Sequence, residues 1–585
     1  AYEKAIDAIA RSAGADGTVF DRPGISIKLS ALHPRYDFAN RERVLAELLP
    51  RVQALAERAR RGNIGLTLDA EEADRLDLSL DLLERVFASP ALAGWEGFGL
   101  AVQAYQKRAL FVVDWLAALA RSQGRRLMVR LVKGAYWDTE VKRAQAGGLV
   151  GYPVFTRKCN TDVSYLACAA RLLSAPEAFY PQFATHNAHT VAAILERAGE
   201  LPYEFQRLHG MGEELYAEVT GARGRPCRVY APVGTHEDLL PYLVRRLLEN
   251  GANTSFVNRI ADVTLPVERV VTDAVAVAQA HEAKPNPRIV PPSDLYGAWR
   301  NSAGIVFADT VASAPLLAKM AAPLARTDWR AAPLVGGQER AGDSTPVVDP
   351  ARGVVIGHVR EAGADTVEEA LACVAGAKLP EVEQRARILE RAADAIEAER
   401  ATLMALLARE AGKTLPDALG EVREAADFCR YYAMLARRQF ASPQVLPGPT
   451  GESNDLRLAG RGPFACISPW NFPLAIFAGQ VAAAFAAGNG VLAKPAEQTP
   501  LVAFEAVRLL IRSGVPAEAI AFLPGRGEIV GASLVADPRV AGVAFTGSTE
   551  TARAINRALA AREGPIVPFI AETGGLNAMI VDSSA

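Results

Sequence analysis

Polar and charged side chains recur in this sequence at the places where short apolar runs end. The set consists of Lys28; Asp69 with Glu71 and Glu72; Gln103; Arg130 with Lys133; Arg157 with Lys158; His186 with Asn187; Gln206; and Tyr230. Each one alone is explained by a strand end that meets solvent. Eight in succession, several of them Lys, Arg or Asp inside apolar runs, predict one shared site for a polar ligand.

Two adjacent arginines, Arg245 and Arg246, lie in a predicted helix that begins near His236 and ends at Asn250–Gly251, a common stop signal. Arginine suits bidentate capture of a carboxylate. Neighbours on a helix point about 100° apart, so both reach one ligand only over the helix edge. The alternative is an exposed pair between Arg245 and Glu249, worth about 0.3–0.5 kcal/mol. The residues alone leave both interpretations open.

Arg130, Lys133 and Trp137 cluster after one apolar run, with Gly134 between them. The cations could hold a pyrophosphate, and the glycine allows a close approach of the backbone to a ligand. Trp137 either faces an aromatic ring of the ligand or is a packed loop aromatic.

His186 and His189 are three residues apart and could face one metal ion. The segment around them offers no acidic third ligand, and the sequence contains no H-E-x-x-H motif. We therefore expect no metal site.

The elements that must position these residues are alternating strands and helices. Eight short apolar runs, each followed by an amphipathic segment, begin near Ile25, Ile64, Phe98, Leu127, Val154, Phe183, Phe205 and Val229. Eight βα units in about 250 residues predict a (β/α)8 barrel, although a doubly wound open sheet has the same rhythm. In either arrangement ligands bind at the carboxyl ends of the strands, and Lys28 and Asp69 would come from neighbouring strands and form an ion pair.

A second α/β region follows a boundary. Pro285–Pro292 contains four prolines and cannot continue a helix or a central strand. Beyond it we predict two strands around a turn in Pro346–Val359 and two long helices, Glu383–Ala411 and Pro416–Arg438. Strands are then predicted near FACIS, GVLAK, AFLPG, GVAFTG and IVPFIAE, with glycines at the strand-to-helix turns that are typical of a dinucleotide-binding sheet.

Composition excludes several classes of protein. The 585 residues include 64 Lys plus Arg and 66 Asp plus Glu, a net charge of −2 that argues against a generally basic nucleic-acid binder. Hydrophobic residues make up 50% and charged residues 22%, as in globular proteins. The longest apolar stretch is too short for a membrane span. Six cysteines without a C-x-x-C pair suit a reducing cytoplasm.

Several motifs in chain order resemble the proline dehydrogenase domain of the bifunctional bacterial proline utilization A family: KLSALHPRY, LDAEEADRL, QAYQKR, RLVKGAYWDTE, FATHNAHT, LHGMGE and YAPVGTHEDLLPYLVRRLLENGANTSF. The resemblance implies a (β/α)8 barrel with noncovalent FAD that oxidises L-proline to Δ1-pyrroline-5-carboxylate. It implies that Arg245 and Arg246 bind the proline carboxylate with Lys28 and Tyr230. Asp69 would orient Lys28, Leu208 would pack on the ring, and Arg130 would lie by the reactive flavin nitrogen. The residues implied to line FAD are Asp69, Gln103, Arg130, Val132, Lys133, Gly134, Trp137, Thr156, Arg157, Lys158, His186, Asn187, Glu249, Thr254, Ser255 and Phe256.

Motifs in the second region, ISPWNFPLAI, LAKPAEQTP, FTGSTETA and ETGGLNAMIV, resemble the aldehyde dehydrogenase superfamily in its L-glutamate γ-semialdehyde dehydrogenase branch. The resemblance implies a Rossmann-type NAD-binding domain. Lys494 and Glu497 would hold the adenine ribose, and Gly547 and Ser548 the pyrophosphate at a helix start. Asn471 would donate to the oxyanion and Glu572 would act as general base. A Gly-Ser-Thr turn alone is commonly only a helix cap.

The nucleophilic cysteine of the aldehyde dehydrogenases is expected beyond Ala585, and Cys466 is expected to be a small core residue. We therefore expect a fragment that lacks both termini, with proline oxidation present and aldehyde oxidation confined to the full-length protein. The expected divisions are a barrel over residues 1–261, a proline-rich connector with helices over 262–340, and a truncated NAD-binding domain over 341–585.

The resemblance also implies partners. Membrane quinone would accept the electrons, which allows peripheral contact of a cytoplasmic protein with the bacterial inner membrane, and the full-length protein would form a homo-oligomer. No nucleic-acid partner is expected for this stretch, because it contains no ribbon-helix-helix module. The alternatives are a non-catalytic regulatory or scaffold protein and a flavoenzyme for another cyclic amine such as hydroxyproline.

Overall fold

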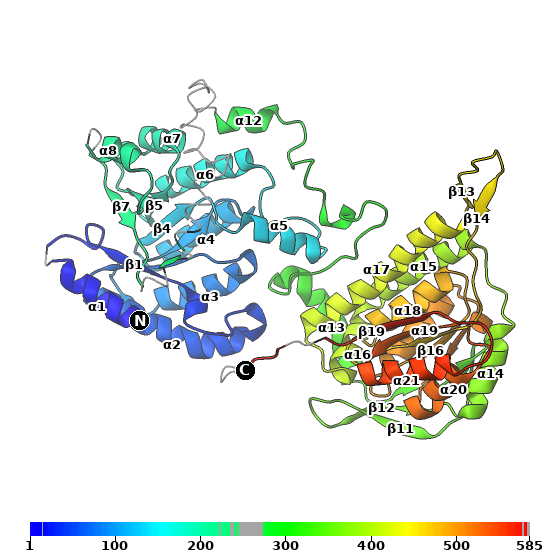
Figure 1. The fold of residues 1–585 in the computed structure, drawn as a ribbon. Helices are drawn as coiled ribbons and strands as arrows, with labels where there is room; N and C mark the ends of the chain where they lie inside the picture. The colour runs from blue at the N-terminus through cyan, green and yellow to red at the C-terminus, as the bar shows by residue number, and fades with distance from the viewer. Residues whose placement is uncertain are drawn as a thin grey trace. The chain divides into compact units, whose positions relative to one another are not determined.

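The computed structural model describes residues 1–14, 16–221, 224–234, 239, 240, 242, 244, 273–575 and 578–581. It divides into two compact units (Figure 1). The first contains Ala1–Ala146 and Gly151–Pro291, and the second contains Gly147–Val150 and Pro292–Ile580. The division at Pro291 and Pro292 falls within the proline-rich stretch that the sequence marks as a boundary.

Within its described residues, the first unit is built on a parallel sheet of seven strands in chain order. They are β1 (Gly24–Ile27), β2 (Gly65–Leu68), β3 (Phe98–Gln103), β4 (Leu127–Val132), β5 (Phe179–Ala184), β6 (Glu204–Leu208) and β7 (Cys227–Tyr230). Every residue of β2 and β3 is buried, as expected for parallel strands covered on both faces. The sheet confirms the predicted α/β architecture and seven of the eight predicted strands.

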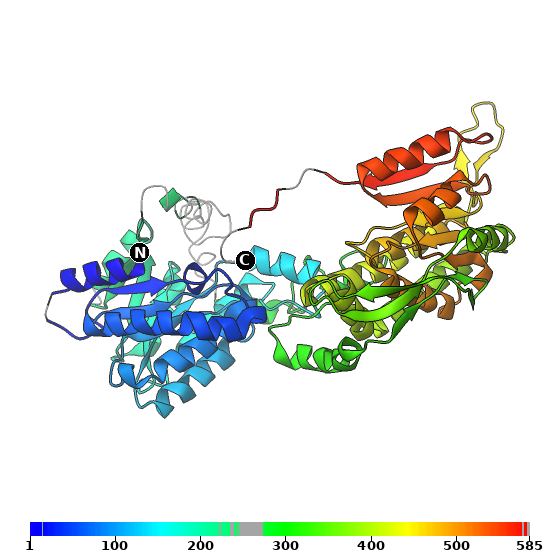
Figure 2. The same cartoon turned by 90° about the horizontal axis from the view of Figure 1, so that it is seen from below.

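Helices alternate with these strands and cover the outside of the sheet (Figure 1). They are α1 (Tyr2–Ser12), α2 (Arg41–Arg61), α3 (Leu76–Phe87), α4 (Ala109–Ser122), α5 (Trp137–Ala146), α6 (Lys158–Leu173), α7 (Ala188–Ala198), α8 (Glu213–Gly221) and α12 (Ala274–Ala280). Figure 2 shows α1 and α2, in blue, side by side. The buried residues of α2 recur at Val44, Leu48, Val52 and Leu55, which is the helical spacing of one apolar face.

The sheet curls into a partial barrel. Nη2 of Arg130 on β4 lies 2.5 Å from Oγ of Ser26 on β1, whereas strands three apart in a flat sheet would be about 14 Å apart. Arg228 on β7 donates to the carbonyl oxygens of Arg22 and Phe20, just before β1, at 2.6 and 2.9 Å. The first and seventh strands are therefore brought together.

The strand predicted at Val154 is wrong. This residue forms only an isolated antiparallel bridge with Gln106, in the connection between α5 and α6. Pro153 precedes it and α6 begins at Lys158, so the segment is too short for a strand that crosses the sheet. The predicted helix from His236 to Asn250–Gly251 lies mostly outside the described residues.

The second unit contains a doubly wound sheet in the order β10-β9-β17-β16-β15-β18-β19. Its parallel strands are β15 (Phe464–Ile467), β16 (Val491–Lys494), β17 (Ile520–Phe522), β18 (Gly542–Gly547) and β19 (Phe569–Thr573), and all five confirm the sequence prediction. The short strands β9 (Leu334–Val335) and β10 (Gln338–Glu339) extend one edge in antiparallel fashion. The order of the parallel strands is that of a dinucleotide-binding fold.

Two smaller sheets complete this unit. The predicted strand pair is β11 (Ser344–Val348) and β12 (Val355–Arg360), which form an antiparallel pair beside β8 (Trp329–Ala331). A separate hairpin consists of β13 (Gln444–Leu446) and β14 (Asn454–Leu456).

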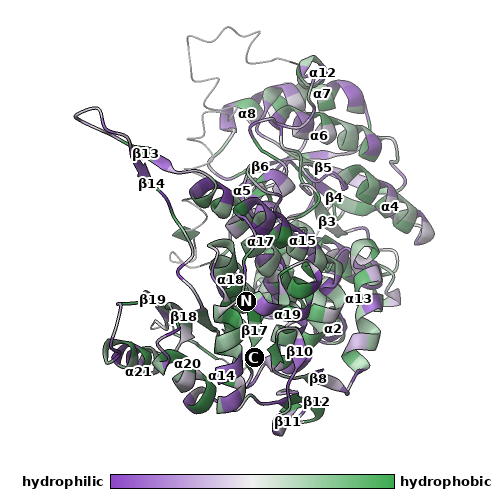
Figure 3. Cartoon of the chain, turned by 90° about the vertical axis from the view of Figure 1, so that its right-hand side faces the viewer, coloured by the Kyte–Doolittle hydropathy of each residue, from purple (hydrophilic) through white to green (hydrophobic). Residues whose placement is uncertain are grey.

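The helices of the second unit are α13 (Thr310–Ala325), α14 (Ala364–Ala375), α15 (Val382–Ala398), α16 (Arg400–Glu410), α17 (Leu415–Phe440), α18 (Ala475–Ala486), α19 (Pro500–Arg512), α20 (Ala532–Ala536) and α21 (Thr549–Ala560). The single helix predicted over Glu383–Ala411 is therefore wrong, because the chain breaks at Glu399, where ψ is 16°. A break of one residue leaves the apolar period almost unchanged, so the pattern does not reveal it. Figure 3 shows α18 mostly in the hydrophobic colour, and most of its residues are buried.

Within the part of the chain that the structure describes, no helix has the length and hydrophobicity needed to cross a membrane.

A buried carboxyl group joins two helices of this unit. Glu410, the last residue of α16, is 3% exposed and accepts hydrogen bonds from the backbone N–H groups of Leu501 and Val502 at 2.6 and 2.9 Å. These donors lie in the first turn of α19, where N–H groups have no partner within the helix. Burial raises the pKa of Glu410 to about 8, against the opposite effect of the two hydrogen bonds.

We expect the unfolding free energy of the second unit to fall as the pH rises from about 4.5 through about 8. The reason is that the folded protein holds the Glu410 proton more tightly than the unfolded chain does. Glu410→Gln removes this part of the pH dependence, whereas Glu563→Gln, a change at an exposed acid, leaves it intact. Urea unfolding at several pH values measures it, and equal slopes for wild type and Glu410→Gln would contradict the expectation.

Candidate functional site

Arg130 is the centre of the polar cluster inside the curled sheet. It is 8% exposed, although it stands in the middle of the apolar strand β4. Its guanidinium donates to Asp69 Oδ1 at 2.7 Å, to Gln206 Oε1 at 2.7 Å and to Ser26 Oγ at 2.5 Å. A buried cation is tolerated only when it is paired and hydrogen-bonded, and here the partners come from β1, the end of β2, and β6.

Tyr230, at the end of β7, completes this cluster. The Arg130 guanidinium carbon lies 4.6 Å from the centre of the Tyr230 ring, and the phenol donates to Asp69 Oδ2 at 3.3 Å. Burial and the negative charge of Asp69 raise the pKa of Tyr230, and the Arg130 charge opposes them. The phenol is therefore a neutral donor at physiological pH.

Lys28 lies beside this cluster, at the end of β1. Its Nζ is 3.3 Å from the hydroxyl of Tyr136, while the ion pair of Asp69 is with Arg130. Asp69 was expected to orient Lys28 directly, and it acts on the ammonium instead as a nearby charge. Burial lowers the pKa of Lys28, but the net effect of Tyr136, Glu71 and Asp69 is to raise it.

Tyr136 is a further candidate site residue that the sequence motifs alone do not single out. It lies between Gly134 and Trp137, within the motif RLVKGAYWDTE. Its place in this motif is the feature of the sequence that could have identified it.

The loop after β4 is fixed by close packing. Gly134 has φ of +132°, and a Cβ atom there would lie 2.5 Å from the ring of Tyr105, so a larger residue does not fit. Lys133 forms an ion pair with Asp162 on α6. The indole N–H of Trp137 donates to the carbonyl oxygen of Phe155 at 2.8 Å.

Two loops that carry candidate cofactor residues lie against each other. Phe155 N–H donates to the carbonyl oxygen of Tyr105 at 2.8 Å, which holds Thr156, Arg157 and Lys158 near the end of β3. At that end, Gln103 accepts a hydrogen bond from the Gln106 amide at 2.8 Å.

Other expected site residues have structural partners of their own. Thr156 Oγ1 accepts from Asn286 N–H at 3.0 Å, and Arg157 Nε donates to the carbonyl oxygen of Pro285 at 3.1 Å. His186 Nε2 accepts from Leu208 N–H at 3.2 Å, and the Asn187 side chain caps α7. Val132 is the last residue of β4.

Six expected site residues lie outside the described residues: Arg245, Arg246, Glu249, Thr254, Ser255 and Phe256.

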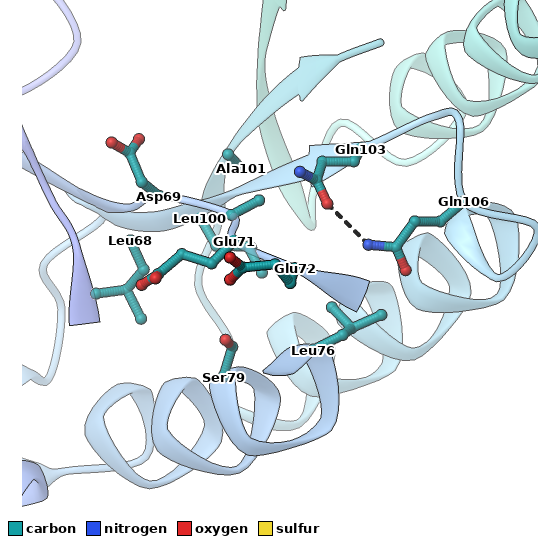
Figure 4. A pocket seen from close by; sticks show the side chains of 11 residues that line it. Leu68, Asp69, Glu71, Glu72, Leu76, Ser79, Leu100, Ala101, Gln103 and Gln106 are labelled. Atoms are coloured by element: carbon teal, nitrogen blue, oxygen red, sulfur yellow. Dashed lines mark hydrogen bonds between the residues drawn. The ribbon is translucent and has the colours of Figure 1, made fainter. Parts of the chain in front are cut away.

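A small cavity of about 20 Å³ lies where β2 and β3 end above α3 (Figure 4). It has room for about one water molecule. Its polar lining includes Asp69, Glu71, Glu72, Gln103 and Gln106.

In the second unit, Lys494 is the last residue of β16 and Glu497 lies in the loop that follows. Lys494 is 4% exposed, its Nζ is 4.0 Å from Glu497 Oε1, and burial lowers its pKa. Glu497 Oε1 also accepts from Gly527 N–H at 2.7 Å. A lysine and a carboxylate therefore meet at the carboxyl ends of β16 and β17, where doubly wound sheets bind nucleotides.

Gly547 and Ser548 lie where β18 ends and α21 begins. Ser548 Oγ accepts from Thr551 N–H at 3.1 Å and so caps the helix. A Cβ atom on Gly547 would lie 2.6 Å from the Phe545 ring, which explains the glycine by packing. The backbone N–H groups of this helix start remain suited to an anion.

The turn that contains Asn471 is held from two sides. The buried Glu421 accepts from Leu474 N–H and Ala475 N–H at 2.8 and 3.2 Å and pairs with Lys413 at 3.2 Å. Lys413 Nζ in turn lies 4.1 Å from the centre of the Phe472 ring, next to Asn471. The exposed Glu572 lies on β19.

Cys466 is a core residue, as expected. It is completely buried in β15, and burial raises its pKa to about 12. A neutral, inaccessible thiol is not a nucleophile.

Asp69→Leu should lower the stability of the first unit by about 3 kcal/mol, because it leaves the buried Arg130 charge without its counter-ion. The double variant Asp69→Leu/Arg130→Met should regain much of that loss. Denaturant unfolding of the two single variants and the double variant measures the coupling. Strictly additive effects would contradict an ion pair that stabilises as a unit.

Two known families match the chain, one over the first seven-stranded sheet and the other over most of the second unit. Residues 1–259 match the proline dehydrogenase family, and residues 338–585 match the aldehyde dehydrogenase family. The 1-pyrroline-5-carboxylate dehydrogenase of Anoxybacillus flavithermus is 38% identical over 265 residues, which cover 43% of this chain and 51% of that protein.

Other relatives match the entire chain. The bifunctional protein PutA of Klebsiella aerogenes is 54% identical over 611 residues, and that of Rhizobium meliloti is 52% identical over 607. Each match covers 100% of this chain but 45% and 47% of the relative, so the chain spans about half the length of these proteins.

Solved structures of similar proteins also match nearly the whole of this chain. A crystal structure of a Bradyrhizobium japonicum proline utilization A variant is 52% identical, with a TM-score of 0.88, and the match covers 99% of this chain and 57% of that one. Proline utilization A from Bdellovibrio bacteriovorus, inactivated by N-propargylglycine, is 31% identical, also with a TM-score of 0.88, over 98% of this chain and 61% of that one. The chain is therefore similar along its whole length to bifunctional proline utilization A proteins, with a part that matches the proline dehydrogenase family followed by a part that matches the aldehyde dehydrogenase family.

Proposed function

We propose that the first unit oxidises L-proline to Δ1-pyrroline-5-carboxylate with FAD as its cofactor. The observation that carries the proposal is the cluster of Arg130, Asp69 and Tyr230 beside Lys28, at the carboxyl end of a curled parallel sheet. Active sites of such barrels lie at that end.

The residues present fit a flavin dinucleotide. The cofactor carries a pyrophosphate and a ring system rich in acceptors. The chain offers the cations Lys133, Arg157 and Lys158, and the Gln103 amide, whose oxygen is already engaged by Gln106 and whose N–H donors remain for a ligand. When bound, FAD supplies the hydride acceptor.

The protein's own groups would bind and orient the substrate. Lys28, with Arg245 and Arg246, binds the proline carboxylate. Tyr230 and Leu208 lie against the proline ring. Holding the carboxylate fixes the orientation of the ring, which is catalysis by positioning. Arg130 contributes a preorganised positive charge whose direction is set by Asp69, Gln206 and Ser26.

For the second unit, the proposal is that Lys494 and Glu497 bind the adenine ribose of NAD and that Gly547 and Ser548 lie at its pyrophosphate. Within the whole protein, Asn471 would stabilise the oxyanion and Glu572 would act as base in the oxidation of L-glutamate γ-semialdehyde. Membrane quinone as electron acceptor, a cytoplasmic location with peripheral membrane contact, and a homo-oligomeric state belong to the same proposal.

Anaerobic titration with L-proline should bleach the flavin absorbance of the purified protein reconstituted with FAD. Hydroxyproline should bleach it less, because the ring lies against Tyr230. The flavin spectrum recorded at each addition measures both reactions. A protein that does not bind FAD, or a bound flavin that is indifferent to proline, would sink the proposal for the first unit.

Lys494→Met should weaken NAD binding about tenfold or more, since it removes a buried donor from the ribose site, and tenfold corresponds to ~1.4 kcal/mol. Lys378→Met, at an exposed lysine of the same unit, should bind NAD as the wild type does. Isothermal titration with NAD gives both affinities. Equal affinities for the two variants would rule out the assigned ribose site.

A further inference from the structure

Glu71 is a buried acid next to the candidate substrate site with no role in the Arg130 cluster. It lies in the loop after β2, two residues beyond Asp69, and is 7% exposed. It also lines the small cavity, where Figure 4 shows its carboxylate between Leu68 and Glu72. A desolvated carboxylate is costly unless its oxygens are engaged.

Both of its oxygens are engaged, and one of them holds the neighbouring strand's loop. Oε1 accepts a hydrogen bond from Ser30 N–H at 3.0 Å, and Oε2 pairs with Arg75 Nη1 at 2.7 Å. Ser30 lies in the single turn Leu29–Ala31, which follows Lys28 directly. The carboxylate therefore anchors the turn after Lys28 to the loop after β2.

The same turn is braced on its outer side. The carbonyl oxygen of Leu32 accepts from Arg51 Nη1 on α2 at 2.9 Å. Glu71 provides the anchor on the inner side, which faces the site. Without it, the turn after Lys28 would lose its hydrogen bond to the loop after β2, and the direction of the Lys28 side chain would be less constrained.

Charge supports this geometry. Although burial lowers the pKa of Lys28, the net shift is upward, and the charge of Glu71 contributes more to it than that of Asp69.

We propose that Glu71 is a positioning residue for Lys28: it fixes the turn after β1 so that the ammonium faces the carboxylate of the bound ring. The assignment of that carboxylate to Lys28 rests on the proposed function.

The test compares three substitutions in the FAD-loaded full chain. Glu71→Leu removes the anchor. Glu71→Gln keeps an oxygen acceptor for Ser30 N–H and should restore most of the effect. Glu84→Leu, at an exposed acid on α3, is the matched control. The measurements are kcat and KM for L-proline, and the affinity for cyclopentanecarboxylate, a ring carboxylate that has no nitrogen and cannot be converted to an imine.

Glu71→Leu should raise KM for proline and Kd for cyclopentanecarboxylate about tenfold, with kcat and flavin content nearly unchanged, because a lost hydrogen bond to a charged group is of that order. In a Lys28→Met background the same substitution should add almost nothing. A merely structural role predicts equal effects in both backgrounds. Such equality, or unchanged KM and Kd in Glu71→Leu, would overturn the proposal.

Hydrogen exchange separates this proposal from the proposed function. Amide exchange in residues 28–31 should accelerate in Glu71→Leu and not in Glu84→Leu, whatever the substrate is. If the wild-type flavin ignores proline but exchange accelerates, the proposed function fails and the anchoring stands. If exchange in this turn is unchanged, the positioning proposal fails on its own.

Discussion

The first unit depends on one buried cation. Arg130 stands in the middle of an apolar strand, and its charge must be balanced inside the sheet because it is almost entirely shielded from solvent. The balance comes from Asp69 after β2, with Ser26 on β1 and Gln206 on β6 as further acceptors. These groups meet only if the sheet curls. The same curvature that shapes the sheet therefore brings the acceptors to the Arg130 charge. The polar interior that results is what makes the carboxyl end of this sheet suitable for chemistry.

In the second unit, carboxylates accept hydrogen bonds from backbone N–H groups that have no partner within their own helix or turn. Glu410 accepts from the first turn of α19, Glu421 from the start of α18, and Glu497 from Gly527 after β17. In each case an acid from one segment satisfies backbone N–H groups at the beginning of another. Two of the three are buried deeply enough that these bonds fix how the helices start, and the third is shared with the candidate nucleotide site. The starts of segments near the carboxyl ends of the strands are therefore set by side chains from elsewhere in the sequence.

Much of the architecture could be predicted from the sequence, because parallel strands and amphipathic helices leave regular apolar patterns. Seven strands of the first sheet and five of the second follow those patterns. The strand predicted at Val154 is wrong because a short apolar run beside a proline has the composition of a strand but not its length. The single helix predicted across Glu399 is wrong because a break of one residue does not disturb helical periodicity.

At the site, residue types and motifs predicted that Lys28, Asp69, Arg130 and Tyr230 lie in one place. The pairing of Asp69 with Arg130 and the contact of Lys28 with Tyr136 depend on curvature, which no local pattern encodes.

Arg228 joins β7 to the backbone just before β1, across 206 and 208 positions of the sequence. Contacts of such separation form late, because the loop they close is long. During synthesis β1 leaves the ribosome long before Arg228, and the Tyr230 ring that packs over Arg130 is also added only with β7. We therefore expect these contacts between β7 and the segment before β1 to form only after β7 has been synthesised, and until then the β1 side of the sheet is an exposed edge.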